Sequence, residues 1–178
     1  MERYTFSIKL NRFAGPLLAH CTDYQREARS IETAFAARDI NKLESYLLFS
    51  DKGEMAHRIF LQELALAALE EISEETAPIL ERAFHRAVKS EWRCCEGIVR
   101  SLARLKGAAA GPFLLKALEH PSYGARYYAA YCIGKVGYAE ALPALKAELS
   151  AVRGNHQLSS YAFALQRSIE ALGSEFRA

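Results

Sequence analysis

The sequence predicts a protein made only of α-helices, arranged as a row of similar helical pairs. Three observations predict this fold class: a helix-start pattern that recurs along the chain, apolar triplets with helical spacing at a similar interval, and turn-forming residues between them. The chain has 178 residues, of which 51% are hydrophobic and 25% charged. That composition supplies enough apolar material for a packed core and fits a single domain.

The helix-start pattern is carried by proline. Four of the five prolines are followed by apolar residues with helical spacing, and the intervals between them are 62, 34 and 31 residues; they are Pro16, Pro78, Pro112 and Pro143. Proline is favoured at the first position of a helix because its missing N–H would be unpaired there in any residue. Since 62 is twice 31, the spacing predicts a repeated unit with one copy that lacks the proline.

A second kind of segment, with apolar residues at helical spacing, alternates along the chain with the helices that begin at a proline. The central apolar residues of four such segments are Leu69, Leu102, Ile133 and Ile169, separated by 33, 31 and 36 residues. Breakers fall between the segments, and Gly137 stands where the end of a helix favours a left-handed residue. A helical unit that recurs at 31–36 residues is typical of a solenoid, in which each unit buries its apolar face against its neighbours.

The expected organisation of the single domain 1–178 has an N-terminal part and a repeated part. The N-terminal part is an extended arm over residues 1–10 and a half-repeat over 11–21. In the arm, apolar and polar residues alternate as in a strand, which predicts either an arm packed over the first helices or an edge that pairs with a second chain. The helical pairs are expected at 22–49, 54–89, 91–119 and 122–152, with a capping helix at 156–172.

Residues 118–149 resemble the HEAT-like repeat of the phycobilisome-lyase type. The resemblance is carried by the segments His120 to Arg126, Ala129-Ala130, Ile133-Gly134, Val136-Gly137 and Glu140 to Leu145. Residues 91–119 keep part of the pattern, with Cys95 in the place of Arg126. The resemblance implies a right-handed α-α superhelix (a HEAT-like solenoid) of about four helical pairs plus terminal capping helices. It also implies that second helices line a concave surface and that Arg126 braces adjacent units through a hydrogen-bonded charge pair.

The sequence contains no pattern that predicts catalysis. The five histidines lie in different units or loops, and the cysteines lack the spacings of zinc or redox sites. Phosphate-binding glycine loops and nucleophile elbows are absent as well. We therefore expect no catalytic residue, no metal and no cofactor. No stretch of about 20 apolar residues is present, and the default expectation is a soluble cytoplasmic protein with reduced, buried cysteines.

The charge is unevenly distributed along the chain. Residues 1–81 carry 9 basic and 14 acidic side chains, whereas residues 82–135 carry 10 basic and 3 acidic ones. In a solenoid this difference predicts an acidic end and a basic middle. The basic residues expected to line the concave groove, or alternatively to form an ordinary solvated face, are Arg82, His85, Arg86, Lys89 and Lys116. Lys116 follows its unit proline by four residues, as Arg82 does.

Tyr127 and Tyr131 lie largely off the inward face of their predicted helix. Tyrosine is enriched at interfaces, so the pair is a second candidate contact; the competing interpretation is packing against neighbouring helices.

Together these features favour a non-enzymatic scaffold that binds a protein or peptide with an acidic surface through a partly basic groove. Two alternatives stay open: a bilin lyase or chromophore-handling accessory protein, on resemblance alone, and a nucleic-acid-binding relative. A net charge of +2 and a pI of 8.3 disfavour the last, because duplex DNA binding needs several phosphate contacts. No membrane partner is expected.

Overall fold

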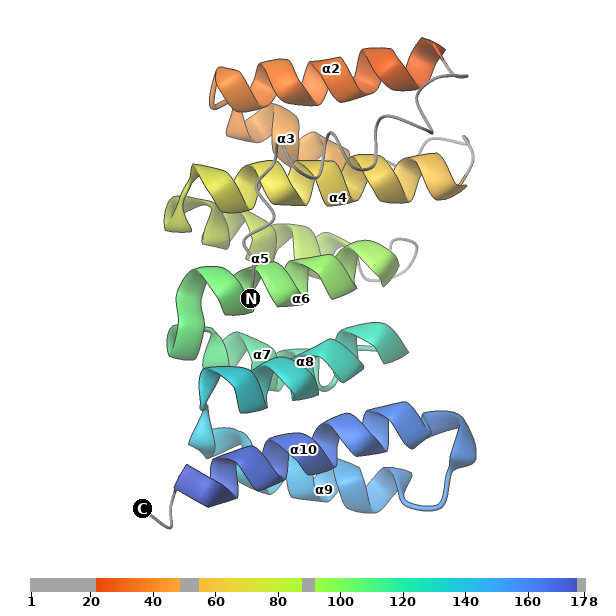
Figure 1. The fold of residues 1–178 in the computed structure, drawn as a ribbon, viewed down its shortest axis with the longest axis vertical. Helices are drawn as coiled ribbons and strands as arrows, with labels where there is room; N and C mark the ends of the chain where they lie inside the picture. Colours follow the sequence, from red (N-terminus) through yellow and green to blue (C-terminus); the bar gives the residue numbers. More distant parts are fainter. Residues whose placement is uncertain (1–21, 49–54, 88–91, 176–178) are drawn as a thin grey trace. The chain divides into compact units, whose positions relative to one another are not determined.

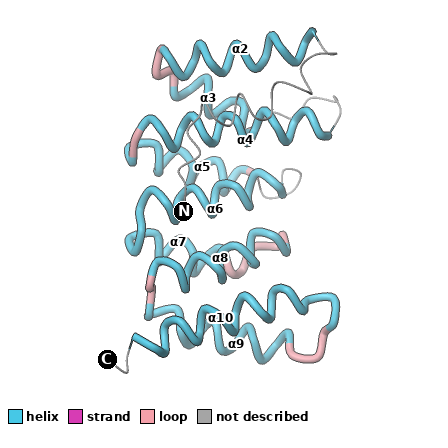
Figure 2. The backbone as a smooth tube through the Cα atoms, in the orientation of Figure 1, coloured by secondary structure: helices cyan, strands magenta, loops and turns pink. Residues whose placement is uncertain are grey.

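The computed structural model describes residues 22–48, 55–87 and 92–175, and within these ranges the regular elements are all helical (Figure 2). The predicted all-α class is therefore confirmed for this part of the chain. The predicted arm at 1–10 and half-repeat at 11–21 lie outside the described residues. Contacts divide the chain into two compact units, Met1–Ala87 and Val88–Ala178. The single domain, the number of helical pairs and the right-handed superhelix stay predictions.

The first unit consists of two layers of helices. Its elements are α2 (Thr22–Ala36), α3 (Ile40–Leu47), α4 (Met55–Ile72), the short 3-10 helix η1 (Glu74–Thr76) and α5 (Ala77–Arg86). Helix α4 packs against both α2 and α3, and α3 packs against α5 (Figure 1). The order of helix, short turn and helix is the one that the sequence predicts.

Two buried side chains tie loops and helices together within this unit. The Gln62 amide donates a hydrogen bond of 3.2 Å from Nε2 to the carbonyl oxygen of Leu47. The Thr76 hydroxyl donates one of 3.0 Å to the carbonyl oxygen of Leu69. Each bond satisfies a carbonyl group near the end of a helix, where no intrahelical partner remains.

The second unit continues the same pattern. Its elements are α6 (Trp92–Lys106), η2 (Gly107–Ala110), α7 (Gly111–Ala117), α8 (Tyr123–Val136), η3 (Ala139–Ala141), α9 (Leu142–Val152), η4 (His156–Leu158) and α10 (Ser159–Glu175). Helix α8 is central: it packs against α6, α7 and α10, while α10 also packs against α9. Helices α6, α8 and α10 thus form one layer of this unit (Figure 1).

The helix-start and helix-stop residues act as the sequence predicts. Pro78, Pro112 and Pro143 each occupy the first turn of a helix, in α5, α7 and α9. Gly137 ends α8 with φ 72° and ψ 33°, a left-handed conformation that is costly for residues with a Cβ. These elements are local in origin, which is why sequence alone predicts them.

The repeated apolar residues form the core of each unit. Leu69, Leu102 and Ile133 have no exposed surface, and Ile169 is half-buried. Burying a side chain of this size contributes about 1.5–3 kcal/mol. The recurring interval in the sequence therefore reflects one fully buried position on each of α4, α6 and α8, and a half-buried one on α10.

Candidate binding surface

The basic side chains of α5 lie on the face opposite to its buried face. Ala77, Leu80, Ala83 and Phe84 are buried, and the opposite side of the helix faces solvent. Arg82, His85 and Arg86 are all exposed, as their spacing predicts. We call these three residues the α5 face.

One carboxylate contacts both arginines of the α5 face. Glu44 of α3 has Oε2 at 3.4 Å from Nη2 of Arg82, and Oε1 at 3.7 Å from Nη1 of Arg86. Only 12% of the Glu44 side chain is exposed, against 53% and 63% of the two arginine side chains. Two positive charges thus share one negative charge, and the α5 face keeps a net positive charge.

Sequence analysis did not identify Glu44. It stands 38 residues before Arg82, which is roughly the length of one repeat. Glu44 lies on α3, the second helix of its pair, as Arg82 lies on α5, the second helix of the next pair. That spacing is the signal that could have found it, because equivalent helices in adjacent repeats lie side by side.

The structure leaves the predicted positions of Lys89 and Lys116 in the groove untested. Lys89 lies outside the described residues. Lys116 is exposed in the last turn of α7, which belongs to the second compact unit. The common groove for Arg82 and Lys116 stays a prediction.

The two predicted tyrosines have different surroundings. Tyr127 is half-buried, and the edge of its ring meets the ring of Tyr128 at a centroid distance of 5.1 Å and an interplanar angle of 88°. Tyr131 is 42% exposed, with the Lys135 ammonium 5.6 Å from its ring centroid. Tyr131 is therefore a surface residue, whereas Tyr127 is less accessible, and its role as a contact stays a prediction.

Several residues that carry the resemblance to the HEAT-like repeat have a structural role in or beside α8 and α9. Ser122 caps α8: its Oγ accepts a hydrogen bond of 3.4 Å from the Ala125 N–H. A β-carbon at Gly134 would lie 2.8 Å from the Cα of Ser168 in α10, so the motif glycine permits close helix approach. Gly137 ends α8 and Pro143 starts α9.

The segment from α8 to α9 carries the match to a family model. Residues 125–150 match the family model of the PBS lyase HEAT-like repeat. The match runs from the first turn of α8, through η3, to near the end of α9. No curated protein and no solved structure matches the chain.

Within the HEAT-like repeat, Arg126 contacts the next helix of the layer through an aromatic ring. Its guanidinium carbon lies 5.6 Å from the centroid of the buried Tyr161 ring in α10. The Tyr161 hydroxyl in turn donates a hydrogen bond of 3.1 Å to Oε2 of Glu148 in α9. Where the resemblance implied a hydrogen-bonded charge pair, the buried Nε of Arg126 has no hydrogen-bond partner among the described residues.

His120 is buried and lies five residues before the segment that matches the family model. Its Nδ1 accepts a hydrogen bond of 3.1 Å from the backbone N–H of Ser122, so the neutral ring carries its proton on Nε2. Burial lowers the pKa of His120, and the positive charge of Arg126 lowers this pKa further. The lowered pKa favours the neutral form that the hydrogen bond requires.

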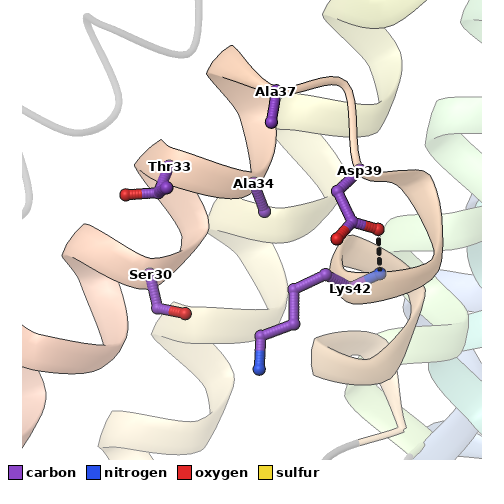
Figure 3. Close-up of a pocket in the computed structure, with 6 residues that line it drawn as sticks. All are labelled: Ser30, Thr33, Ala34, Ala37, Asp39 and Lys42. Atoms are coloured by element: carbon purple, nitrogen blue, oxygen red, sulfur yellow. Dashed lines mark hydrogen bonds between the residues drawn. The ribbon is translucent and has the colours of Figure 1, made fainter.

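A pocket of about 320 Å³ opens between α2 and α3 in the first unit (Figure 3). It is lined by Ser30, Thr33, Ala34, Ala37, Asp39 and Lys42. Asp39 Oδ1 accepts a hydrogen bond of 3.0 Å from the Lys42 N–H, and Thr33 donates one of 2.8 Å to the carbonyl oxygen of Arg29. Asp39 therefore caps the start of α3, and the Thr33 hydroxyl bonds the backbone of its own helix.

The remaining reactive side chains are dispersed. No group of three or more His, Cys, Asp or Glu residues is placed to hold a metal among residues 22–48, 55–87 and 92–175. Cys94, Cys95 and Cys132 are buried and form no disulfide among the described residues, and Cys21 lies outside these residues. Among the described helices, none combines the length and apolar composition that crossing a membrane requires.

Proposed function

We propose that this chain is a non-enzymatic helical-repeat scaffold that binds an acidic protein or peptide, with the α5 face as one contact surface. The observation that carries the proposal is the excess charge there: Arg82 and Arg86 are more than half exposed, and the single carboxylate of Glu44 contacts both. A ligand carboxylate can pair with the exposed part of either guanidinium group, whose fork geometry suits bidentate contact.

Preorganisation supports this proposal. The α5 helix is held by four buried residues, and Glu44 holds the two guanidinium groups near each other. A ligand would therefore meet side chains whose conformational freedom is already reduced, which lowers the entropic cost of binding. Lys116, exposed on α7, is proposed as an additional contact.

The proposal is tested with a fluorescein-labelled oligoglutamate peptide and the full chain, by fluorescence anisotropy. The variant Arg82→Glu/Arg86→Glu/Lys116→Glu should lose at least about tenfold in affinity, because complementary charges become repulsive. A matched control, Arg29→Glu/Lys146→Glu/Arg153→Glu, changes the net charge equally at exposed positions and should lose less than about twofold.

Equal losses in the two triple variants would attribute binding to net charge and remove the α5 face from the proposal. Because Arg82→Glu places a second carboxylate beside Glu44, a milder variant, Arg82→Gln/Arg86→Gln, is measured in parallel. Its far-ultraviolet circular dichroism should equal that of the wild type, and it should still bind the peptide less tightly.

A further inference from the structure

Helices α6 and α8 of the second unit run side by side in the same direction. A β-carbon at Gly124 would collide with the carboxyl group of Glu96, which places the start of α8 beside Glu96. One turn further along both helices, the Arg100 guanidinium lies 5.0 Å from the ring centroid of Tyr128. Each contact pairs residues 28 apart, so the two helices advance together (Figure 1).

Towards the C-terminal ends of α6 and α8, positively charged side chains lie near Cys132 of α8. Burial raises the pKa of the Cys132 thiol to about 11, and Arg104, Arg100 and Lys135 each act in the opposite direction. Three cations from two helices therefore lie near one side chain of α8, and no carboxylate contributes to this field.

Helices α6 and α8 themselves carry little negative charge. Helix α8 contains no Asp or Glu, and the single acidic residue of α6 is Glu96, which lies at the opposite end of α8 from Lys135. Residues 88–178 as a whole carry 12 Lys and Arg against 7 Asp and Glu, a net charge of +5.

Two aromatic rings of α8, those of Tyr131 and Tyr128, are each covered on one face by a cation. The Lys135 ammonium lies 5.6 Å from the Tyr131 ring centroid, as the Arg100 guanidinium does over Tyr128 at 5.0 Å. A nucleic-acid base would have to displace a cation to stack on the covered face. The groups presented to solvent are instead N–H and O–H donors, which suit a ligand rich in hydrogen-bond acceptors.

We propose that Arg104, Tyr131 and Lys135, supported by Arg100 and Tyr128, form a second binding surface that takes a carboxylate-rich segment of an acidic protein. We call these five residues the α6–α8 face. Arg104 and Lys135 are exposed and Tyr131 is 42% exposed, so a ligand can reach all three. The proposal deepens the proposed function and rests on it for the class of partner, but it concerns other helices and other side chains.

The test uses the full chain and the labelled oligoglutamate peptide. The variant Tyr131→Ala/Lys135→Glu removes an exposed aromatic residue and reverses the charge four residues later. Helix α10 offers a matched control, Phe163→Ala/Arg167→Glu, since Phe163 is 64% exposed and Arg167 is exposed. We expect the first variant to lose at least about tenfold in affinity and the second less than about twofold.

Three outcomes decide the proposal. Equal losses in both double variants would overturn it, because net charge alone would then explain binding. Tighter binding of a single-stranded oligonucleotide with the same number of negative charges would also overturn it, in favour of a nucleic-acid surface. A loss specific to Tyr131→Ala/Lys135→Glu supports it, provided that circular dichroism shows an unchanged fold. If that variant unfolds, Tyr131→Phe/Lys135→Gln replaces it, with an expected loss of about threefold.

The two binding surfaces can fail separately. Loss of affinity in Arg82→Gln/Arg86→Gln alone would support the α5 face and overturn the α6–α8 face. Loss in Tyr131→Ala/Lys135→Glu alone would do the reverse. If both variants lose affinity, combining them should multiply the losses, because independent sites contribute additively to the free energy.

Discussion

Gly134 of α8 and Ser168 of α10 approach so closely that a β-carbon on Gly134 would stand 2.8 Å from the Cα of Ser168 and 2.6 Å from its Oγ. The Ser168 hydroxyl also donates a hydrogen bond of 2.7 Å to the carbonyl oxygen of Ala130. The two helices are thus joined by a close approach and a buried hydrogen bond at the same level.

Gly134→Ala should therefore destabilise the protein by about 1–3 kcal/mol, because backbone at this distance cannot yield without separating the helices. Gly173→Ala in α10 is the control: a β-carbon there meets nothing within 4 Å, and alanine favours a helix by up to about 1 kcal/mol. Urea unfolding measures both. A neutral Gly134→Ala would contradict the close approach.

Gly137→Ala tests the end of α8. With φ at 72°, alanine should cost about 1–2 kcal/mol in the free energy of unfolding. Asparagine tolerates the left-handed region better, so Gly137→Asn should cost less than Gly137→Ala. Thermal and urea unfolding of the two variants provide the comparison, and an alanine variant at least as stable as the asparagine variant would argue against a left-handed cap.

His120 should make stability depend on pH. Burial and Arg126 place its folded-state pKa below the ordinary value of 6.5, so the unfolded chain takes up the proton first as the pH falls. The contribution is complete above about pH 6.5 and is lost as the pH falls through the folded-state pKa. Unfolding free energies at pH 7.5 and 5.5 should differ more for the wild type than for His120→Asn.

The charge of Arg126 gives this prediction a second measurement. Arg126→Met keeps an apolar stem against the Tyr161 ring but removes the positive charge that opposes protonation of His120. The pKa of His120, followed by NMR of the imidazole protons, should rise in the variant. Lys146→Met, at an exposed position of α9, should leave it unchanged; an equal rise in both would show that the local contact is unimportant.

Glu44→Gln should increase affinity for an acidic peptide at the α5 face. The substitution removes the carboxylate that contacts both Arg82 and Arg86. Exposed ion pairs contribute about 0.2–1 kcal/mol, so the gain should reach up to about fivefold. Glu75→Gln changes the same charge at an exposed position elsewhere in the unit, and an equal gain there would show that only net charge matters.

Local features of the sequence predict the elements of the fold well. Pro112 and Gly137 act within a few residues of themselves, through a missing N–H and a missing Cβ. The buried faces follow from the helical spacing of apolar residues such as Leu102 and Ile133. Each of these signals depends only on neighbouring residues, so no knowledge of tertiary contacts is needed.

The candidate surfaces were predicted less completely. The exposure of Arg82, His85 and Arg86 follows from the helical pattern, but the shared contact with Glu44 does not. Tyr131 was predicted as an aromatic contact, whereas its association with Lys135 was missed. The interaction of Lys135 with Tyr131 spans four residues and was detectable; the contacts between α6 and α8 were not.

The sequence by itself determined where helices start and stop, which faces are apolar and where basic residues accumulate, because these properties arise from covalent geometry and short-range spacing. Only the tertiary structure decided which charged side chain meets which ring or carboxylate. Arg126 meets Tyr161, and Arg100 meets Tyr128, because helices distant in the chain pack at particular relative positions. Those positions depend on side-chain shape across the whole interface, which no single segment specifies.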